Sequence, residues 1–94
     1  MSVYSIWDSR FPAEAIDEGI TVTKAIWHDM LSFDGYLEHE LIHDLDQPGH
    51  VIVVSRWTCR EAAAAALSYA SHPNAQRANA LVSEPRRRTL GAPV

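Results

Sequence analysis

The sequence of 94 residues has a single cysteine, Cys59, so it cannot form an internal disulfide, which fits a reducing compartment. No apolar run approaches the roughly 20 residues that a membrane-spanning helix requires. Asp8 and Arg10 stand where a secretory signal would need an apolar core. These absences predict a cytoplasmic protein without a membrane partner.

Basic residues are also scarce, and the net charge of −4 gives no reason to expect nucleic acid as a partner. The only basic cluster, Arg86-Arg87-Arg88, has no interleaved aromatic residues and is predicted to be a solvated terminal strand. Acidic residues are concentrated in positions 1–50 and basic ones in 51–94, so the two halves should attract each other. With no repeats and no low-complexity linker, residues 1–94 are predicted to form one domain.

The first half of the chain shows strand and helix patterns in turn. Residues 2–8 are rich in aromatic and β-branched side chains and predict a strand. Pro12 suits the first turn of a helix, and apolar residues then recur at spacings of three and four until about Gly35. Residues 36–45 and 51–57 predict two strands joined by the turn Asp46-Gln47-Pro48-Gly49.

In the second half, Thr58 and Glu61 have the spacing of a capping box at a helix start. The alanine run continues that helix to Ser71-His72-Pro73, and Asn74 can cap a short helix that runs through Val82. A last strand is predicted around 86–90. The resulting β-α-β-β-α-β order predicts an α+β, ferredoxin-like fold with a four-stranded antiparallel sheet and helices on one face.

The other face of such a sheet would be bare. We expect it to expose Val51, Val53 and their neighbours, so two sheets are predicted to pack together in a homodimer.

Residues 39–43 read His-Glu-Leu-Ile-His, the H-E-x-x-H signature of zinc proteases, which requires a helix. The Pro48-Gly49 turn and the β-branched run behind the motif favour a strand instead. On a strand the two histidines lie roughly 13 Å apart and cannot share one zinc ion. A zinc metalloprotease is therefore the least favoured function, and no metal site is predicted. The strand pattern places Leu37, His39, Leu41 and His43 on one face, opposite Tyr36, Glu38, Glu40 and Ile42.

The hairpin 35–57, the helix start Arg60-Glu61-Ala62 and the Ser71-His72-Pro73 break resemble the antibiotic biosynthesis monooxygenase domain family over nearly the whole chain. That resemblance implies a dimeric α/β barrel of ferredoxin-like subunits. Members of the family include oxygenases that convert phenolic anthrones to quinones without metal or flavin, haem-degrading enzymes, and proteins without known activity. It therefore implies a cofactor-independent, monooxygenase-like protein that uses dioxygen and a small aromatic or polyketide-type substrate.

The resemblance also implies site residues. His43, Trp57 and Arg77 fall near pocket positions of the family and are the catalytic candidates. A strand face, a helix end and the following loop should border the same cleft. The candidates for contact with the substrate are accordingly Trp27, His39, Tyr69 and His72.

The sequence departs from the family at several positions. Val53 and Ala63 stand near positions where quinone-forming relatives have asparagine and tyrosine. For the haem-degrading branch, Ala66 replaces a tryptophan and Trp7 an asparagine, which disfavours haem degradation. The alternative function is a non-enzymatic dimeric module that binds a small hydrophobic ligand, and an apolar cleft without converging polar groups would favour it.

Overall fold

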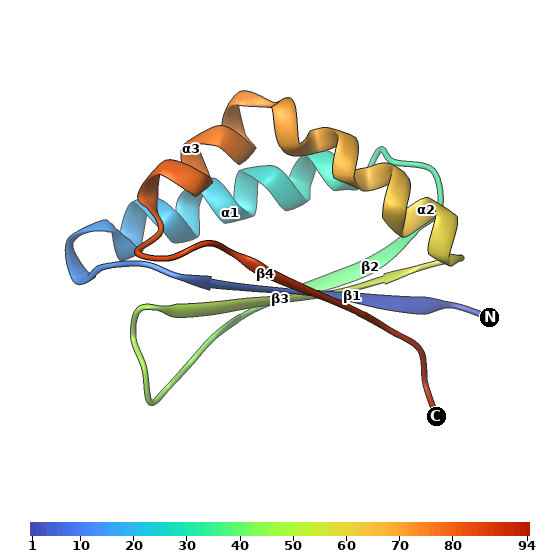
Figure 1. Cartoon of the computed structure of the whole chain (residues 1–94), viewed down its shortest axis with the longest axis horizontal. Helices are drawn as coiled ribbons and strands as arrows, with labels where there is room; N and C mark the ends of the chain where they lie inside the picture. The colour runs from blue at the N-terminus through green and yellow to red at the C-terminus, as the bar shows by residue number, and fades with distance from the viewer.

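The computed structural model describes all residues, 1–94, and contains one four-stranded antiparallel sheet with the helices on one of its faces (Figure 1). The strands are β1 (Val3–Arg10), β2 (Tyr36–His43), β3 (His50–Trp57) and β4 (Arg87–Gly91). The helices are α1 (Ile16–Met30), α2 (Arg60–Ala65) and α3 (Pro73–Leu81), with 3₁₀ segments η1 (Ala13–Ala15) and η2 (Ala66–Ser71). The predicted α+β, ferredoxin-like fold is confirmed. None of the helices combines the length and the apolar character needed to cross a membrane.

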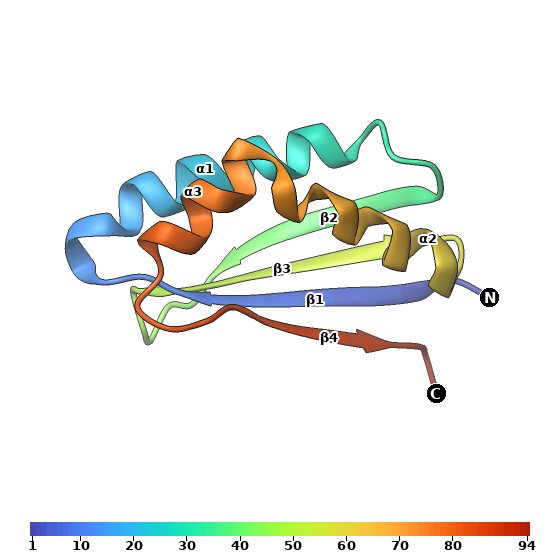
Figure 2. The same ribbon diagram turned by 45° about the horizontal axis from the view of Figure 1, so that its top comes forward.

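The sheet has the strand order β2-β3-β1-β4, so β1 and β3 are central and β4 is an edge strand (Figure 2). In β3 the residues Val51, Val53, Ser55 and Trp57 are buried. Successive side chains on a strand point to opposite faces, so these four share one face, and they lie against the helical layer. The core of the molecule therefore sits between β3 and the helices.

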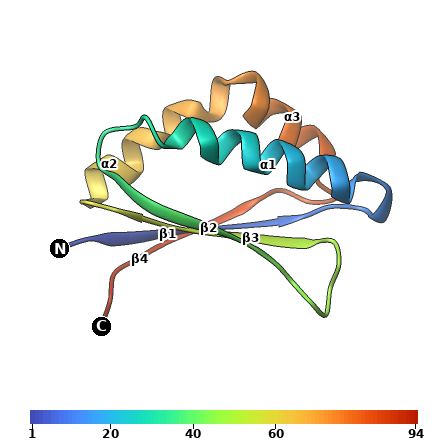
Figure 3. The same ribbon diagram turned by 180° about the vertical axis from the view of Figure 1, so that it is seen from behind.

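The second face of the sheet is covered by no other element of the chain (Figure 3). The expectation that Val51 and Val53 lie on it is wrong, because both are buried on the helical side at 2% and 3% exposure. Their neighbours Ile52 and Val54 occupy the uncovered face instead. Ile6 pairs with Val54, and Ile42 with Ile52, so the centre of this face is still apolar.

A β-bulge interrupts the alternation predicted for β2. Tyr36 pairs with Trp57 but Glu38 pairs with Arg56, so Leu37 is an extra residue in the ladder. The bulge brings Tyr36 onto the same face as His39, and their side chains form a hydrogen bond with 2.5 Å between Oη and Nδ1. The prediction that these two residues face opposite ways is therefore wrong.

The two predicted helix caps are also wrong. The N-cap of α2 is Cys59, and no side chain accepts a hydrogen bond from the first turn, so Thr58 and Glu61 do not form a capping box. The Thr58 amide instead donates to the carbonyl of Gly35. For α3 the cap is His72, whose Nδ1 accepts from the Asn74 amide at 3.0 Å, while Pro73 occupies the first turn.

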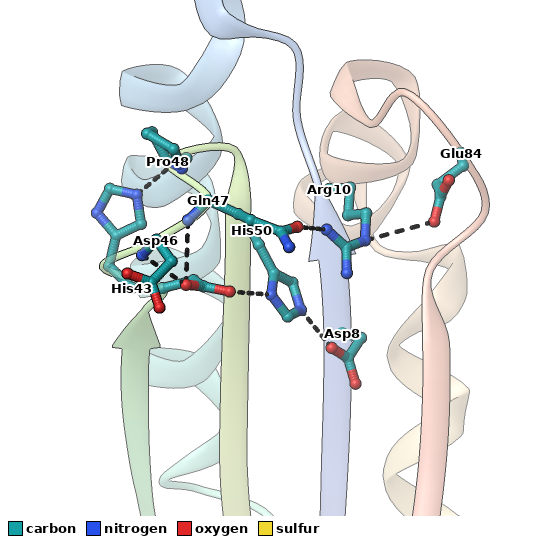
Figure 4. A network of polar contacts seen from close by, with 9 residues as sticks. Asp8, Arg10, His43, Asp46, Gln47, Pro48, His50 and Glu84 are labelled. Carbon is teal, nitrogen blue, oxygen red and sulfur yellow. Dashed lines mark hydrogen bonds and ion pairs between the residues drawn. The ribbon is translucent and has the colours of Figure 1, made fainter.

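The hairpin end of the sheet holds a network of polar contacts (Figure 4). His50 is buried, and its ring lies between two carboxylates, with 2.8 Å from Nδ1 to Asp44 Oδ2 and 2.5 Å from Nε2 to Asp8 Oδ1. The other oxygen of Asp44 accepts hydrogen bonds from the amides of Asp46 and Gln47. His50 therefore links the hairpin turn to β1.

Candidate functional site

An apolar cavity lies between the helical layer and the sheet. Of its 14 lining residues, 11 are hydrophobic. The empty space inside it is about 530 Å³, including its open side. The lining residues are Ser5, Trp7, Ile26, Trp27, Met30, Trp57, Ala63, Ala66, Leu67, Tyr69, Ala70, Ala75, Arg86 and Arg88.

Large aromatic residues and small alanines together create this space. Trp27 comes from the buried stripe of α1 and Trp57 from the end of β3, and they are 4% and 0% exposed. The facing helical segments contribute Ala63, Ala66 and Ala75, whose short side chains leave room above the rings. Aromatic faces at the walls of an apolar cavity are suited to contact with another aromatic ring.

The polar edge of Trp57 is occupied within the protein. Its indole Nε1 donates to Ser55 Oγ at 3.0 Å, and Ser55 Oγ donates in turn to the carbonyl of Ser5 at 2.9 Å. This chain of hydrogen bonds satisfies the only donor of a fully buried side chain. Trp57 therefore has no free N–H group with which to bind a ligand.

Tyr69 reaches the cavity from η2. Its hydroxyl donates to Asp29 Oδ2 at 2.5 Å and accepts from Asn74 Nδ2 at 3.3 Å. Burial, followed by the hydrogen bond to Asp29, raises the pKa of Tyr69 above its usual value, so the hydroxyl stays protonated at neutral pH. The ring of His72 stacks on that of Tyr69 with centroids 4.4 Å apart. His72 is exposed and is absent from the cavity lining.

His39 lies beside a cavity residue without lining the cavity itself. Its ring centroid is 5.4 Å from that of Trp27, and its Nδ1 is hydrogen-bonded to Tyr36. Burial lowers the pKa of His39 below its usual value, which favours the neutral imidazole. Among the candidates for contact with the substrate, Trp27 and Tyr69 thus line the cavity. His39 and His72 do not line it, and each packs against one of these two lining residues.

Two of the three catalytic candidates lie outside the cavity. His43 is exposed at the hairpin end, where its Nε2 contacts the carbonyl of Pro48. It pairs with Val51, six positions before Trp57 on β3, which places it roughly 20 Å along the strand from Trp57. Arg77 is exposed on α3 and forms an ion pair with Glu18 of α1. The structure therefore does not bring these two residues together with Trp57 at the cavity, and their catalytic role stays a prediction.

The H-E-x-x-H sequence lies within β2, as predicted. Its histidines have separate partners, Tyr36 for His39 and Pro48 for His43. No three or more histidine, cysteine, aspartate or glutamate side chains of the chain are grouped so that they could hold a metal ion. The motif therefore lacks the helical geometry that its chemistry requires.

Sequence reasoning missed two cavity residues, Arg86 and Arg88. The basic cluster was expected to be solvated, but only Arg87 is exposed, whereas Arg86 and Arg88 are partly buried. Arg88 pairs with Trp7 across β1 and β4 and so shares its helix-facing side. The guanidinium of Arg86 lies over the Trp7 ring, 4.9 Å from its centroid. The two-residue period of a strand is the signal that would have placed both arginines on one face.

Comparisons with known proteins agree with this architecture. SnoaB, a cofactor-independent oxygenase from Streptomyces nogalater, superposes with a TM-score of 0.84 over 99% of this chain and 93% of its own, at 18% identity. Rv0793 from Mycobacterium tuberculosis superposes with a TM-score of 0.81 over 100% of this chain and 96% of its own, at 19% identity. A conserved protein from Methanosarcina mazei superposes with a TM-score of 0.81 over 96% of this chain and 90% of its own, at 8% identity. At such identities the likeness concerns the fold.

No curated protein sequence matches the chain at a significant level. The sequence profile of one family, described as antibiotic biosynthesis monooxygenase, matches residues 3–78, which is most of the chain and includes β1 to β3 and all three helices except the last turn of α3. The strand order, the helical layer and this match together show that the chain belongs to the antibiotic biosynthesis monooxygenase family.

Proposed function

We propose that this protein is a cofactor-independent, monooxygenase-like protein that acts on a small aromatic or polyketide-type molecule, with an oxidation of the anthrone-to-quinone type. The observation that carries the proposal is the apolar cavity walled by Trp27, Trp57 and Tyr69 in a chain of this family. In such a reaction the substrate supplies the electrons. One atom of dioxygen becomes the new carbonyl oxygen on the ring carbon, and the other leaves as water with the two hydrogens of that carbon.

The lining of the cavity restricts how the protein could assist. It contains no histidine, aspartate or glutamate, and the hydroxyl of Tyr69 stays protonated, so no lining group is a good proton acceptor at neutral pH. A substrate acidic enough to ionise without a protein base suits such a site. Phenolic anthrones belong to this class, because their anions are delocalised over the fused rings. The protein would then orient the ring and keep bulk water away from it.

Oxygen uptake with a phenolic anthrone tests the proposal. We expect wild-type protein to consume dioxygen faster than buffer and Trp57→Phe to be slower than wild type, since the cavity wall changes. His43→Ala is the matched control, because His43 lies outside the cavity, and it should turn over like wild type. Wild-type uptake no faster than that in buffer would contradict the proposal.

A second function, a non-enzymatic module that binds a small hydrophobic ligand, is favoured by one observation. The cavity lacks a group that can accept a proton at neutral pH, which an enzyme that activates a weakly acidic substrate would need. Saturable quenching of tryptophan fluorescence by an anthrone, without oxygen uptake above buffer, would identify this function.

We also propose that the functional unit is a homodimer formed through the uncovered sheet face. Its apolar centre contains Ile6, Ile42, Ile52 and Val54, and the 42% exposure of Ile42 leaves apolar surface in water in a single chain. Ile52→Asp would place a charge at that centre and is expected to give monomers in analytical ultracentrifugation. Monomeric wild-type protein at micromolar concentration would contradict the proposed dimer.

A further inference from the structure

The cavity has an electrostatic property that its apolar walls do not predict. Arg86 and Arg88 are the only charged residues among its 14 lining residues. No carboxylate oxygen lies within ion-pair distance of either guanidinium, since every ion pair of the chain involves other residues. The cavity therefore carries two positive charges without a counterion from the protein.

The present partners of these arginines are all neutral. Arg88 donates from Nε to Ser5 Oγ at 3.3 Å and from Nη2 to the Ala63 carbonyl at 3.5 Å. Arg86 donates from Nε to Asn79 Oδ1 at 2.8 Å and stacks on Trp7. Each guanidinium retains further N–H donors beyond these contacts. Both can therefore bind an additional acceptor.

Three other arginines of the chain do form ion pairs and show the contrast with Arg86 and Arg88. Arg10, Arg56 and Arg77 have carboxylate partners near the surface, where ion pairs contribute little to stability. Arg86 and Arg88 are partly removed from water, where a cation without a partner is costly. Burial lowers the pKa of Arg86 below its ordinary value, which reflects this cost. An anion bound in the cavity would reduce it.

The position of Arg86 connects the cavity to the outside. Trp7, Ala70 and Arg86 line both the cavity and a neighbouring hollow on the surface, whose one carboxylate, Glu84, forms an ion pair with Arg10. A ligand with its ring in the cavity could therefore place an acidic group beside Arg86, where the cavity and the hollow meet. Arginine is suited to this task because its planar fork can bind a carboxylate with two parallel hydrogen bonds.

We propose that Arg86 and Arg88 form the acidic-group subsite of the cavity and select flat aromatic ligands that carry a carboxylate or a phenolate. This inference rests on the cavity being the ligand site of the proposed function, and it narrows the substrate class to anionic aromatics. It does not require turnover, so binding measurements test it separately from catalysis.

Quenching of tryptophan fluorescence can measure binding, because Trp7, Trp27 and Trp57 line the cavity. The probes are 1-naphthoate, its methyl ester and 4-nitro-1-naphtholate, whose nitro group makes the phenol acidic enough to be ionised at neutral pH, each titrated at low and at high salt. We expect both anions to bind wild-type protein at least tenfold more tightly than the ester, because an anion gains charge-assisted hydrogen bonds. The preference should shrink at high salt. If only naphthoate shows it, the subsite is specific for carboxylates, and if only naphtholate shows it, for phenolates.

Arg87 provides a matched control, since it lies between the two cavity arginines and is exposed on β4 away from the cavity. Arg86→Met and Arg88→Met should each reduce the anion preference by several fold, and Arg88→Lys should retain part of it. Arg87→Met should behave like wild type. Circular dichroism spectra would verify that each variant is folded.

Equal affinities of wild-type protein for anions and ester would overturn the inference without any variant, as would absence of binding by all three probes. Equal losses in Arg87→Met and Arg88→Met would also overturn it. A clear anion preference without oxygen uptake would instead support the subsite and contradict the oxygenase function.

Discussion

The indole nitrogen of Trp57 donates its hydrogen bond to the hydroxyl of Ser55, two residues earlier on the same strand, at 3.0 Å. Both side chains are almost fully buried, at 0% and 1% exposure. The backbone of a strand places i and i+2 on one face, so the sequence Ser-Arg-Trp supplies the tryptophan with its own acceptor. The wall of the cavity is therefore fixed by its own strand.

Ser55→Ala removes this acceptor and leaves a buried N–H group without a partner. We expect the free energy of unfolding to fall by about 1–3 kcal/mol, the typical cost of an unsatisfied buried donor. The measurement is urea denaturation of the wild type, Ser55→Ala, Trp57→Phe and the double variant. Because phenylalanine has no N–H group, Ser55→Ala should cost less in the Trp57→Phe background. Equal costs in the two backgrounds would contradict this role of Ser55.

The His50 network predicts a pH-dependent stability. The hydrogen bond to Asp44, followed by that to Asp8, raises the pKa of His50 above 6.5. Protonated His50 thus stabilises the fold fully below pH 6.5, and this contribution is lost as pH rises through the folded-state pKa. The hydrogen bond from His50, followed by that from the Asp46 amide, lowers the pKa of Asp44 below 3.8. The ionised Asp44 carboxylate therefore stabilises the fold above pH 3.8, and this stabilisation is lost as pH falls through the folded-state pKa of Asp44.

We therefore expect the contribution of this network to the melting temperature to be greatest between about pH 4 and 6.5, the range set by these ordinary values. In His50→Gln the decline on the alkaline side should be absent. The matched control is His28→Gln, since His28 is exposed on α1 and has no carboxylate partner among the ion pairs. A His50→Gln profile that still declines like the wild type would contradict the assignment to His50.

Gly35 is predicted to resist substitution. Its φ of +83° lies in the left-handed region, and an added Cβ would lie 2.4 Å from Ala62 Cβ. Gly35→Ala should lower the free energy of unfolding by at least about 1–2 kcal/mol from backbone strain alone. Gly91→Ala is the control, because nothing lies within 4 Å of its added Cβ. That substitution should change stability by less than about 0.5 kcal/mol in denaturation experiments. Similar effects of the two substitutions would refute the steric explanation.

The stability of the protein should not depend on zinc. The two histidines of the H-E-x-x-H sequence lie on a strand, roughly 13 Å apart along the backbone, and bind different partners. Melting temperatures in the presence of a chelator and of added zinc should be the same, and elemental analysis should find far less than one zinc per chain. A stoichiometric zinc that stabilises wild-type protein but not His39→Ala would show that the strand geometry has been misjudged.

The element order and the strand position of residues 39–43 were predictable because hydrophobic periodicity, the Pro48-Gly49 turn and the break at Pro73 are local signals. The faces of β2 were not predictable. The extra residue Leu37 changes the phase of the strand, and a bulge depends on the neighbouring strand rather than on local sequence. The helix caps failed for a related reason, because the Thr58 amide is bonded to Gly35, a distant residue.

The candidate site was predicted only in part. Trp27, Trp57 and Tyr69 line the cavity, and large aromatic residues on periodic apolar faces are the easiest cavity residues to find. His43 and Arg77 were chosen from the resemblance to a family. In the structure His43 lies at the hairpin end of β2 and Arg77 on the outer side of α3, both outside the cavity. Arg86 and Arg88 were missed because three consecutive arginines suggested solvent, although a strand exposes only alternate residues.

The bulge at Leu37 decides which face of β2 carries the ring of Tyr36. If Leu37 took a regular place in the ladder opposite Trp57, Tyr36 would fall on the other face, and its ring would turn away from Trp57, which it now meets edge-on with centroids 5.8 Å apart. His39 would lose its hydroxyl partner by the same change. Removing Leu37 would instead leave Tyr36 two positions before His39 and on the same face, so the support behind the cavity depends on the phase of the strand and not on the leucine itself.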